Sequence, residues 1–195
     1  MNTILQTALD LTELSRAMQI AREAVLGGTD WIEAGTPLIK SEGMNAVREL
    51  AKEFPNHKII ADLKTSDTGG LEVEMAAKAG ADVVCILASA DDAVIADALR
   101  GASLYGVELM ADMMNVTDVA GRAKQLADMG VHIINAHVGI DQQMEGKNPL
   151  DILSEISGLG VKVAAAGGLN AETAAAAAAA GADIVIVGAG IYRCG

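Results

Sequence analysis

A four-fold internal repeat is the feature that most constrains how this chain can fold. Four segments begin with a glycine, carry Asp or His two residues later and continue into an apolar run; they start at Gly28, Gly80, Gly130 and Gly181. The glycines are separated by 52, 50 and 51 residues. A glycine that ends a helix can adopt a positive φ. Each segment therefore indicates a helix that stops at the glycine and is followed by a buried strand.

A second series of apolar runs lies between those of the first, and its members end at Asp10, Asp62, Asp112 and Gly167. A unit of two strands and two helices that is used four times predicts a TIM (β/α)8 barrel, formed by residues 1–195 as a single domain. The alternative is an open doubly wound sheet, which has about five or six strands and usually a Gly-x-Gly-x-x-Gly turn after the first strand. The sequence has neither feature.

The alternation of β-branched runs with helical stretches gives the expected elements. We expect strands near 4–9, 30–33, 58–62, 82–87, 107–112, 132–136, 162–165 and 184–187. We expect helices near 12–26, 42–53, 70–79, 90–100, 118–129, 149–157 and 171–180. The residues after the last strand are too few for a full eighth helix, so we expect that helix to be missing from this chain. One flank of the barrel would then be uncovered or would be covered by a partner chain.

The charge balance limits the classes of partner. The chain has 14 Lys and Arg residues against 26 Asp and Glu residues, which gives a formal charge of −12. Such a surface repels nucleic acid and anionic lipid, so we expect neither as a general partner. Aromatic residues make up only 2% of the chain, which argues against platforms for base stacking. An anionic substrate would have to be held by backbone N–H groups or by a few well-placed cations.

The sequence also predicts a cytoplasmic location. No apolar run reaches the roughly 18 residues that are needed to cross a bilayer, and the N-terminal residues lack the pattern of a secretory signal. Cys85 and Cys194 have neither a metal-ligand spacing nor the pattern of a disulfide framework. We therefore expect two isolated thiols in a reducing compartment and no membrane partner.

Catalytic and binding residues of a (β/α)8 barrel lie at the C-terminal ends of its strands. Together the polar and small residues at these positions predict an acidic cup that contains a lysine and a histidine. The rule selects Asp10, Glu33, Asp62, Lys64, Asp67, Asp112, His137, Gly167, Gly168 and Gly188.

The end of the third strand is the most informative of these positions. Asp62 and Lys64 are two residues apart, so their side chains point to the same side of an extended strand, and Asp67 lies on the loop beyond. A lysine flanked by carboxylates stays protonated and can hold an oxyanion or relay protons. With Glu33, the carboxylates offer the oxygen ligands that Mg²⁺ prefers. The alternative is a lysine that is only salt-bridged at a strand end.

Small residues follow the last two strands. Gly167 and Gly168 follow the seventh strand, and Gly188 and Ala189 follow the eighth. Backbone N–H groups in such loops can surround a phosphate, aided by the N-terminus of the next helix. The alternative is a pair of glycine-rich turns that bind no ligand.

His137 ends the sixth strand, where a histidine can serve as an acid or a base; the alternative is a hydrogen-bonded loop residue. The polar segment 143–149 is placed to cover the site, and segment 36–40 after Glu33 either contributes to the site or is a plain turn. His57 and His132 are expected to be structural.

These residues carry a resemblance to a known superfamily. Segment 61–70 resembles the Asp-x-Lys-x-x-Asp signature of the orotidine-5'-monophosphate decarboxylase superfamily. Segments 8–10, 33–37 and 145–149 are similar to the subgroup of 3-hexulose-6-phosphate synthases and 3-keto-L-gulonate-6-phosphate decarboxylases, and more so to the synthases. Val138 also favours the synthases, because the decarboxylase branch is expected to carry an arginine near this position. The similarity runs from the first strand to the last.

The resemblance implies an activity and a set of roles. It implies Mg²⁺-dependent aldol condensation of formaldehyde with D-ribulose 5-phosphate through a 1,2-enediolate, in a homodimer in which Asp67 reaches the neighbouring subunit's site. The alternatives are the sister decarboxylation, which releases CO₂, and a non-catalytic phosphosugar-binding barrel. By motif, metal binding would fall to Glu33 and Asp62, catalysis to Asp62, Lys64, Asp67 and His137, and substrate binding to Asp10, Lys64, Gly167, Gly168, Gly188 and Ala189. Asp112, selected by its place at a strand end, is also expected to bind substrate.

Overall fold

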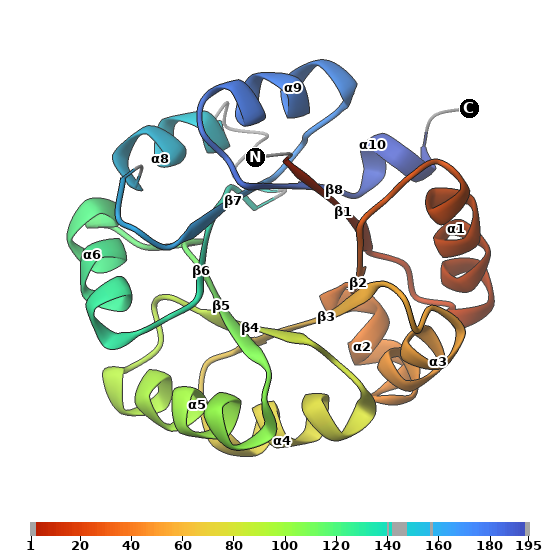
Figure 1. Ribbon diagram of the computed structural model, residues 1–195, viewed down its shortest axis with the longest axis horizontal. Helices are drawn as coiled ribbons and strands as arrows, with labels where there is room; N and C mark the ends of the chain where they lie inside the picture. The colour runs from red at the N-terminus through yellow and green to blue at the C-terminus, as the bar shows by residue number, and fades with distance from the viewer. Residues whose placement is uncertain (1–2, 140, 142–147, 157, 194–195) are drawn as a thin grey trace.

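A computed structural model describes residues 3–139, 141, 148–156 and 158–193. Eight parallel strands follow one another around a closed barrel, with the helices outside them (Figure 1). Because β1 pairs with both β2 and β8, the sheet has no open edge, which confirms the predicted barrel and excludes the doubly wound sheet. The strands are β1 (Ile4–Leu9), β2 (Trp31–Ala34), β3 (Lys58–Thr65), β4 (Val83–Leu87), β5 (Glu108–Asp112), β6 (Ile133–His137), β7 (Lys162–Ala166) and β8 (Ile184–Val187).

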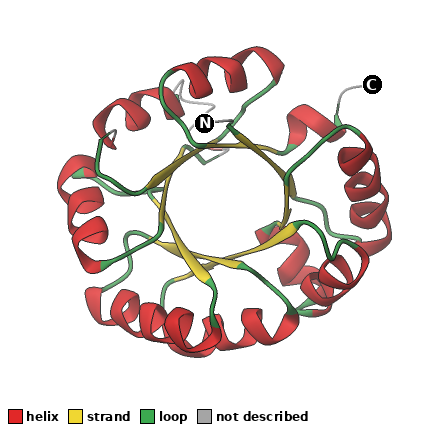
Figure 2. Cartoon of the chain, viewed as in Figure 1, coloured by secondary structure: helices red, strands yellow, loops and turns green. Residues whose placement is uncertain are grey.

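The helices form the outer layer of the molecule (Figure 2). They are α1 (Leu14–Leu26), α2 (Thr36–Glu42), α3 (Asn45–Glu53), α4 (Gly69–Ala79), α5 (Asp92–Tyr105), α6 (Val119–Met129), α8 (Pro149–Ile156), α9 (Ala171–Ala179) and α10 (Ala189–Tyr192). Segment 36–53 differs from the prediction of one helix over 42–53, since α2 precedes α3 and the two are separated at Gly43, whose φ is 65°. Pro37 starts a helix here rather than a turn, because its fixed φ suits the first helical turn.

The four-fold sequence repeat corresponds to a repeated contact between strands. The repeat glycines have φ values of 93°, 102°, 96° and 102°, as the helix-end interpretation predicts. Two residues later, each segment places a side-chain acceptor at the start of an even-numbered strand, and this acceptor receives a backbone N–H from the preceding strand. The pairs are Asp30 with Leu5 (2.8 Å), Asp82 with Ile59 (2.8 Å), His132 with Leu109 (3.0 Å) and Asp183 with Val163 (2.9 Å).

The barrel interior is closed at its N-terminal end and open at the other. Glu108 accepts hydrogen bonds from Lys58 and from Lys162, and the Lys58 ammonium lies 5.0 Å from the centroid of the Trp31 ring. Above this charged layer, apolar side chains such as Ile60 fill the interior. A ligand site is therefore left to the C-terminal end of the strands.

The outer flank of the barrel at β8 is less exposed than expected. No full-length eighth helix lies among the described residues, which continue after β8 through the four-residue α10 to Arg193. The outward-facing Val185 and Val187 of β8 are nevertheless only 6% and 5% exposed, so the flank at β8 is covered within the chain. None of the described helices is long and apolar enough to cross a membrane.

Candidate active site

The C-terminal ends of the strands enclose a cavity of about 570 Å³. The structure therefore brings most of the residues selected from the sequence to one place. Those that line the cavity are Asp10, Glu33, Asp62, Lys64, Asp112, His137, Gly167, Gly168, Gly188 and Ala189.

Lys64 joins two of the carboxylates. Its ammonium nitrogen lies 2.7 Å from Oδ2 of Asp62 and 3.1 Å from Oδ2 of Asp112. The expected meeting of Asp62 and Lys64 is present, but the strand is not regular there. The β3–β4 register shifts between Ala61 and Thr65, and Lys64 has a left-handed backbone with φ of 48°. A bulge of this kind redirects a side chain, here towards β5.

The carboxylates keep Lys64 charged. Burial by itself would lower the pKa of the Lys64 ammonium, but the charges of Asp62 and Asp112 outweigh this effect and raise the pKa above its ordinary value. Lys64 is therefore a permanent cation within the cavity at any physiological pH, held in one position by two hydrogen bonds. Such a group can stabilise negative charge that develops on a substrate oxygen.

Asp112 also holds His137. Its Oδ2 lies 2.7 Å from Nδ1 of His137, and Asp112 is only 1% exposed. Burial alone would raise the pKa of Asp112, but the hydrogen bond from His137, the charge of the His137 ring when it is protonated, and the Lys64 ammonium lower it to about 2. An ionised Asp112 accepts the Nδ1–H of the imidazole, which leaves Nε2 of a neutral His137 able to accept a proton.

The other side of the cavity is crowded with carboxylates. Burial and then the charges of Asp62 and Asp10 raise the pKa of Glu33 well above its ordinary value. Burial and the charge of Asp62 likewise raise the pKa of Asp10, although Lys64 opposes this shift. Three neighbouring carboxyl groups with a single ammonium close by leave negative charge that a cation would neutralise.

These carboxylates fit a divalent cation. Oδ1 of Asp62 is buried without a hydrogen-bond partner, while its Oδ2 accepts from Lys64 and from the Thr36 hydroxyl at 2.8 Å. Among the described residues, no three His, Cys, Asp or Glu side chains group into a complete metal cluster. Glu33 and Asp62 offer the type of oxygen donor that Mg²⁺ prefers, and Mg²⁺ needs only one or two protein carboxylates because water and substrate complete its shell.

The glycine loops form the rim of the cavity opposite Lys64's strand. Gly167 and Gly168 have φ values of 113° and 67°, which side chains adopt only with strain, and they lead into α9. A Cβ on Gly188 would lie 3.3 Å from Oδ2 of Asp10. Bare backbone beside the N-terminus of α9 is a suitable cradle for a phosphate. Tyr192 and Arg193 also line the cavity at this side.

Asp67 stands apart from the other predicted catalytic residues. It is exposed, does not line the cavity, and its Oδ1 accepts the backbone N–H of Thr68 at 2.8 Å. The following Gly69 packs against α5 so closely that a Cβ there would lie 2.3 Å from the carbonyl oxygen of Val94. Gly69, at the start of α4, thus fixes the end of the loop that carries Asp67 against α5. The predicted covering segment 143–149 lies largely outside the described residues.

Several residues of the site were not selected from the sequence. Cys85 and Met110 form part of the cavity floor, and their sulfur atoms are 3.6 Å apart. Asn135 also lines the cavity, is only 5% exposed, and has a buried Oδ1 without a partner. The two-residue period of a strand was the available signal for Asn135, because it lies two residues before His137 and so faces the same side.

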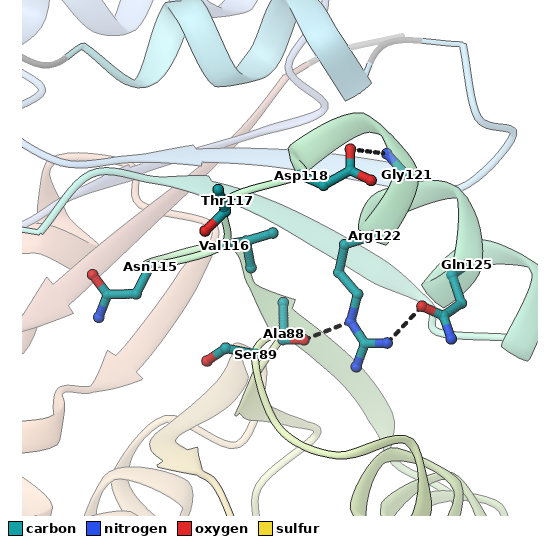
Figure 3. Close-up of a pocket in the computed structure, with 9 residues that line it drawn as sticks. All are labelled: Ala88, Ser89, Asn115, Val116, Thr117, Asp118, Gly121, Arg122 and Gln125. Carbon is teal, nitrogen blue, oxygen red and sulfur yellow. Dashed lines mark hydrogen bonds between the residues drawn. The ribbon is translucent and has the colours of Figure 1, made fainter.

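A second cavity, of about 470 Å³, lies between the loops after β4 and β5 and the start of α6 (Figure 3). Arg122 crosses it and donates hydrogen bonds to the carbonyl oxygens of Ala88 and Ala90 and to Gln125, at 2.7, 2.8 and 2.7 Å. Its guanidinium is engaged in holding the β4–α5 loop against α6. None of the residues selected from the sequence lines this cavity.

Known proteins are similar to this chain both in sequence and in fold. The model of the orotidine 5'-phosphate decarboxylase / HUMPS family matches residues 3–195. The chain belongs to this family. The chain is 41% identical over 189 residues to the 3-hexulose-6-phosphate synthase of Methylomonas aminofaciens. The alignment covers 96% of this chain and 90% of that relative.

Solved structures match the barrel over nearly its whole length. The 3-hexulose-6-phosphate synthase from Salmonella typhimurium has a TM-score of 0.92 and 33% identity, covering 98% of this chain and 92% of the other. The 3-keto-L-gulonate-6-phosphate decarboxylase from Vibrio cholerae has a TM-score of 0.85 and 30% identity, with coverages of 98% and 94%. The resemblance seen in the sequence is confirmed at the level of the family.

Proposed function

We propose that this chain is a 3-hexulose-6-phosphate synthase, an aldehyde-lyase that joins formaldehyde to D-ribulose 5-phosphate. The named relatives support this activity, at 41% identity over nearly the whole chain. The observation that carries the chemistry is the continuous series of contacts from Asp62 through Lys64 and Asp112 to His137. This series places a fixed cation and a proton acceptor in one cavity, which is what enolisation of a ketose requires.

The first step is removal of the C1 proton of the ketose. His137 accepts this proton at Nε2, while Asp112 holds the imidazole by Nδ1 and stabilises the imidazolium that forms. The product is a 1,2-enediolate, whose developing charge is stabilised by the Lys64 ammonium. Asp62 and Asp67 are the alternative proton acceptors.

The second step forms the carbon–carbon bond. C1 of the enediolate attacks the carbonyl carbon of formaldehyde, the oxygen of formaldehyde becomes an alkoxide, and it takes a proton from the His137 imidazolium. The proton that His137 took from C1 thus ends on the new hydroxyl group, and the enzyme returns to its starting state. The product is 3-hexulose 6-phosphate.

Glu33 and Asp62 would hold the Mg²⁺ ion. A bound Mg²⁺ would supply positive charge, in addition to that of Lys64, against the negative charge that develops on the substrate. The support for this part of the proposal is the excess of carboxylates described above, with the raised pKa of Glu33 and the unpartnered Oδ1 of Asp62.

The substrate phosphate would bind at Gly167, Gly168, Gly188 and Ala189. This placement lets an acidic chain bind an anion, because the donors are backbone N–H groups. Asp10 lies between this rim and the carboxylate cluster, next to Gly188, and would contact the sugar hydroxyls. Binding energy from the phosphate would fix the orientation of the carbon chain at the reacting end.

A homodimer would give Asp67 a role. Asp67 is exposed and outside its own chain's cavity, so it can act only on a molecule outside that cavity. We therefore propose that it completes the active site of a second copy of the chain. The reaction is proposed to take place in the cytoplasm, in keeping with a sequence that has no disulfide framework.

Formaldehyde consumption tests the activity. The protein is incubated with formaldehyde and D-ribulose 5-phosphate, and formaldehyde is followed with Mg²⁺, with EDTA, and with EDTA followed by excess Mg²⁺. We expect loss of formaldehyde that needs the pentulose, stops with the chelator and returns with Mg²⁺. No loss under any condition contradicts the synthase proposal. Release of CO₂ from 3-keto-L-gulonate 6-phosphate, without formaldehyde loss, would instead identify the sister decarboxylase.

A further inference from the structure

Gln6 is a buried amide in the barrel interior that no step above uses. It lies in β1, is 0% exposed, and does not line the cavity. The interior cluster around the strands is apolar, with side chains such as Ala8, Ile184 and Ile186. Burial of an amide among such side chains costs free energy unless hydrogen bonds compensate for it.

The amide makes one hydrogen bond, and its partner is Glu33. Nε2 of Gln6 donates to Oε2 of Glu33 at 2.6 Å. In the strand register Glu33 is paired with Ala8 and Gln6 with Trp31, so Gln6 sits one inward-facing position closer to the N-terminal end of the barrel. Gln6 thus reaches Glu33 from below, on the side away from the ligand cavity.

The Glu33 carboxylate depends on this contact. Among the residues that the structure describes, Gln6 is the one for which a hydrogen bond to Glu33 is found. The contact therefore fixes one carboxylate oxygen and leaves the other to a ligand.

The other end of the amide argues against a role in packing alone. Oε1 of Gln6 is buried and has no hydrogen-bond partner. An apolar side chain of the same length would fill the space without the cost of this unpaired oxygen. The amide is therefore best explained by its contact with Glu33.

We infer that Gln6 is a positioning residue for Glu33: its amide fixes one oxygen of the carboxylate so that the carboxylate faces a divalent cation shared with Asp62. This inference rests on the proposed function, which assigns the cation to Glu33 and Asp62. Groups that orient metal ligands typically contribute about 10-fold to 100-fold to metal affinity.

Mn²⁺ binding tests the inference without reference to catalysis. Free Mn²⁺ is followed by electron paramagnetic resonance in titrations of the wild type and Gln6→Met, which keeps an unbranched side chain and removes the donor. Ile184→Met is the matched control, because Ile184 belongs to the same interior cluster and does not line the cavity. Urea unfolding of each variant, without metal, measures the change in packing separately.

We expect Gln6→Met to weaken Mn²⁺ binding by about 10-fold or more, and Ile184→Met to leave it within about twofold. If Gln6→Met does not fold, Gln6→Asn, which keeps the amide but is too short to reach Glu33, carries the same expectation. Unchanged affinity in a folded Gln6 variant overturns the inference and leaves the metal site intact. No Mn²⁺ binding by the wild type itself overturns the metal assignment, and the inference with it.

Discussion

At the scale of single residues, the site is built around one cation that is held in an unfavourable backbone conformation. Lys64 is one of three described non-glycine residues with positive φ, together with Thr68 and Asn115. Such conformations cost about 1–3 kcal/mol and persist where the surrounding structure enforces them. Here two hydrogen bonds, to Asp62 and Asp112, hold the Lys64 side chain. The unfavourable backbone conformation of Lys64 therefore goes together with an ammonium group directed at these two carboxylates.

The pKa of Asp112 gives a prediction for stability. Its value of about 2 in the folded chain, against 3.8 ordinarily, means that the unfolded chain binds the proton more tightly. The ionised carboxylate then stabilises the fold by about 2 kcal/mol above pH 4. Asp112→Asn removes this contribution, so the gap in free energy of unfolding between wild type and variant should be fully present just above pH 4. It should narrow as the pH falls from about 4 towards 2.

Urea unfolding followed at a series of pH values measures this gap. Asp128→Asn is a suitable control, because Asp128 forms only a surface ion pair with Lys124. A gap between wild type and Asp112→Asn that stays constant down to pH 2.5 would contradict the assignment of Asp112 as an ionised, strongly stabilised group.

At the scale of elements, the sequence repeat corresponds to one hydrogen bond at the start of each even-numbered strand. Three of the four repeat units use Asp to accept the N–H of the neighbouring strand, and the third unit uses Nδ1 of His132. Since Nδ1 accepts a hydrogen bond, it carries no proton in this arrangement. His132 is thus a structural residue, as expected from its place at the opposite end of the barrel from the site.

The repeat predicts what His132 can be replaced by. His132→Asp restores the acceptor used in the other three units and should leave the free energy of unfolding within about 0.5 kcal/mol of the wild type. His132→Ala leaves the Leu109 N–H without its partner and should cost about 1 kcal/mol. Urea unfolding at pH 7.5 compares the two. Equal destabilisation by Asp and Ala would show that the side-chain acceptor at this position has no effect on stability.

Periodicity predicts the barrel because each strand and helix repeats the same local signals. The glycines 28, 80, 130 and 181 mark helix ends, and the strands lie within one residue of the expected bounds except β3, which continues three residues further, to Thr65. Local signals did not reveal α2, because Pro37 suits a turn as well as a first helical turn. They also did not reveal the bulge at Lys64, which depends on the pairing of β3 with β4.

The residues that make up the site were more predictable than the hydrogen bonds between them. The strand-end rule selects the carboxylates, the lysine and the histidine because it needs only the sequence position. The bond from Asp112 to both Lys64 and His137 depends on how β3, β5 and β6 are arranged around the barrel. Gln6 was missed for the same reason, since its partner Glu33 is on another strand.

At the scale of the whole molecule, the proposal divides the active site between two chains. Lys64 lines its own cavity, whereas Asp67 is exposed and does not line it. In the proposed symmetric dimer, the Asp67 of each copy would complete the site of the other. A pair of inactive variants can test this arrangement.

Subunit mixing should restore activity. Lys64→Ala and Asp67→Ala are each expected to have lost nearly all activity as homodimers. A mixed dimer contains one site with both residues intact, so random exchange of equal amounts should recover about a quarter of the wild-type formaldehyde consumption. Exchange is achieved by mild denaturation and refolding of the mixture. No recovery, with mixed dimers demonstrated by mass spectrometry, would place Asp67 in its own chain's site or outside catalysis.

In the proposed mechanism, a fixed Lys64 ammonium and a His137 base form an enediolate from the ketose. Solvent deuterium exchange at C1 of D-ribulose 5-phosphate, measured by NMR without formaldehyde, observes this step alone. We predict exchange with the wild type and with the surface control Lys124→Ala, none detectable with Lys64→Ala, and a rate lowered by about 10²–10⁴ with His137→Ala. Undiminished exchange in both Lys64→Ala and His137→Ala would contradict the claim.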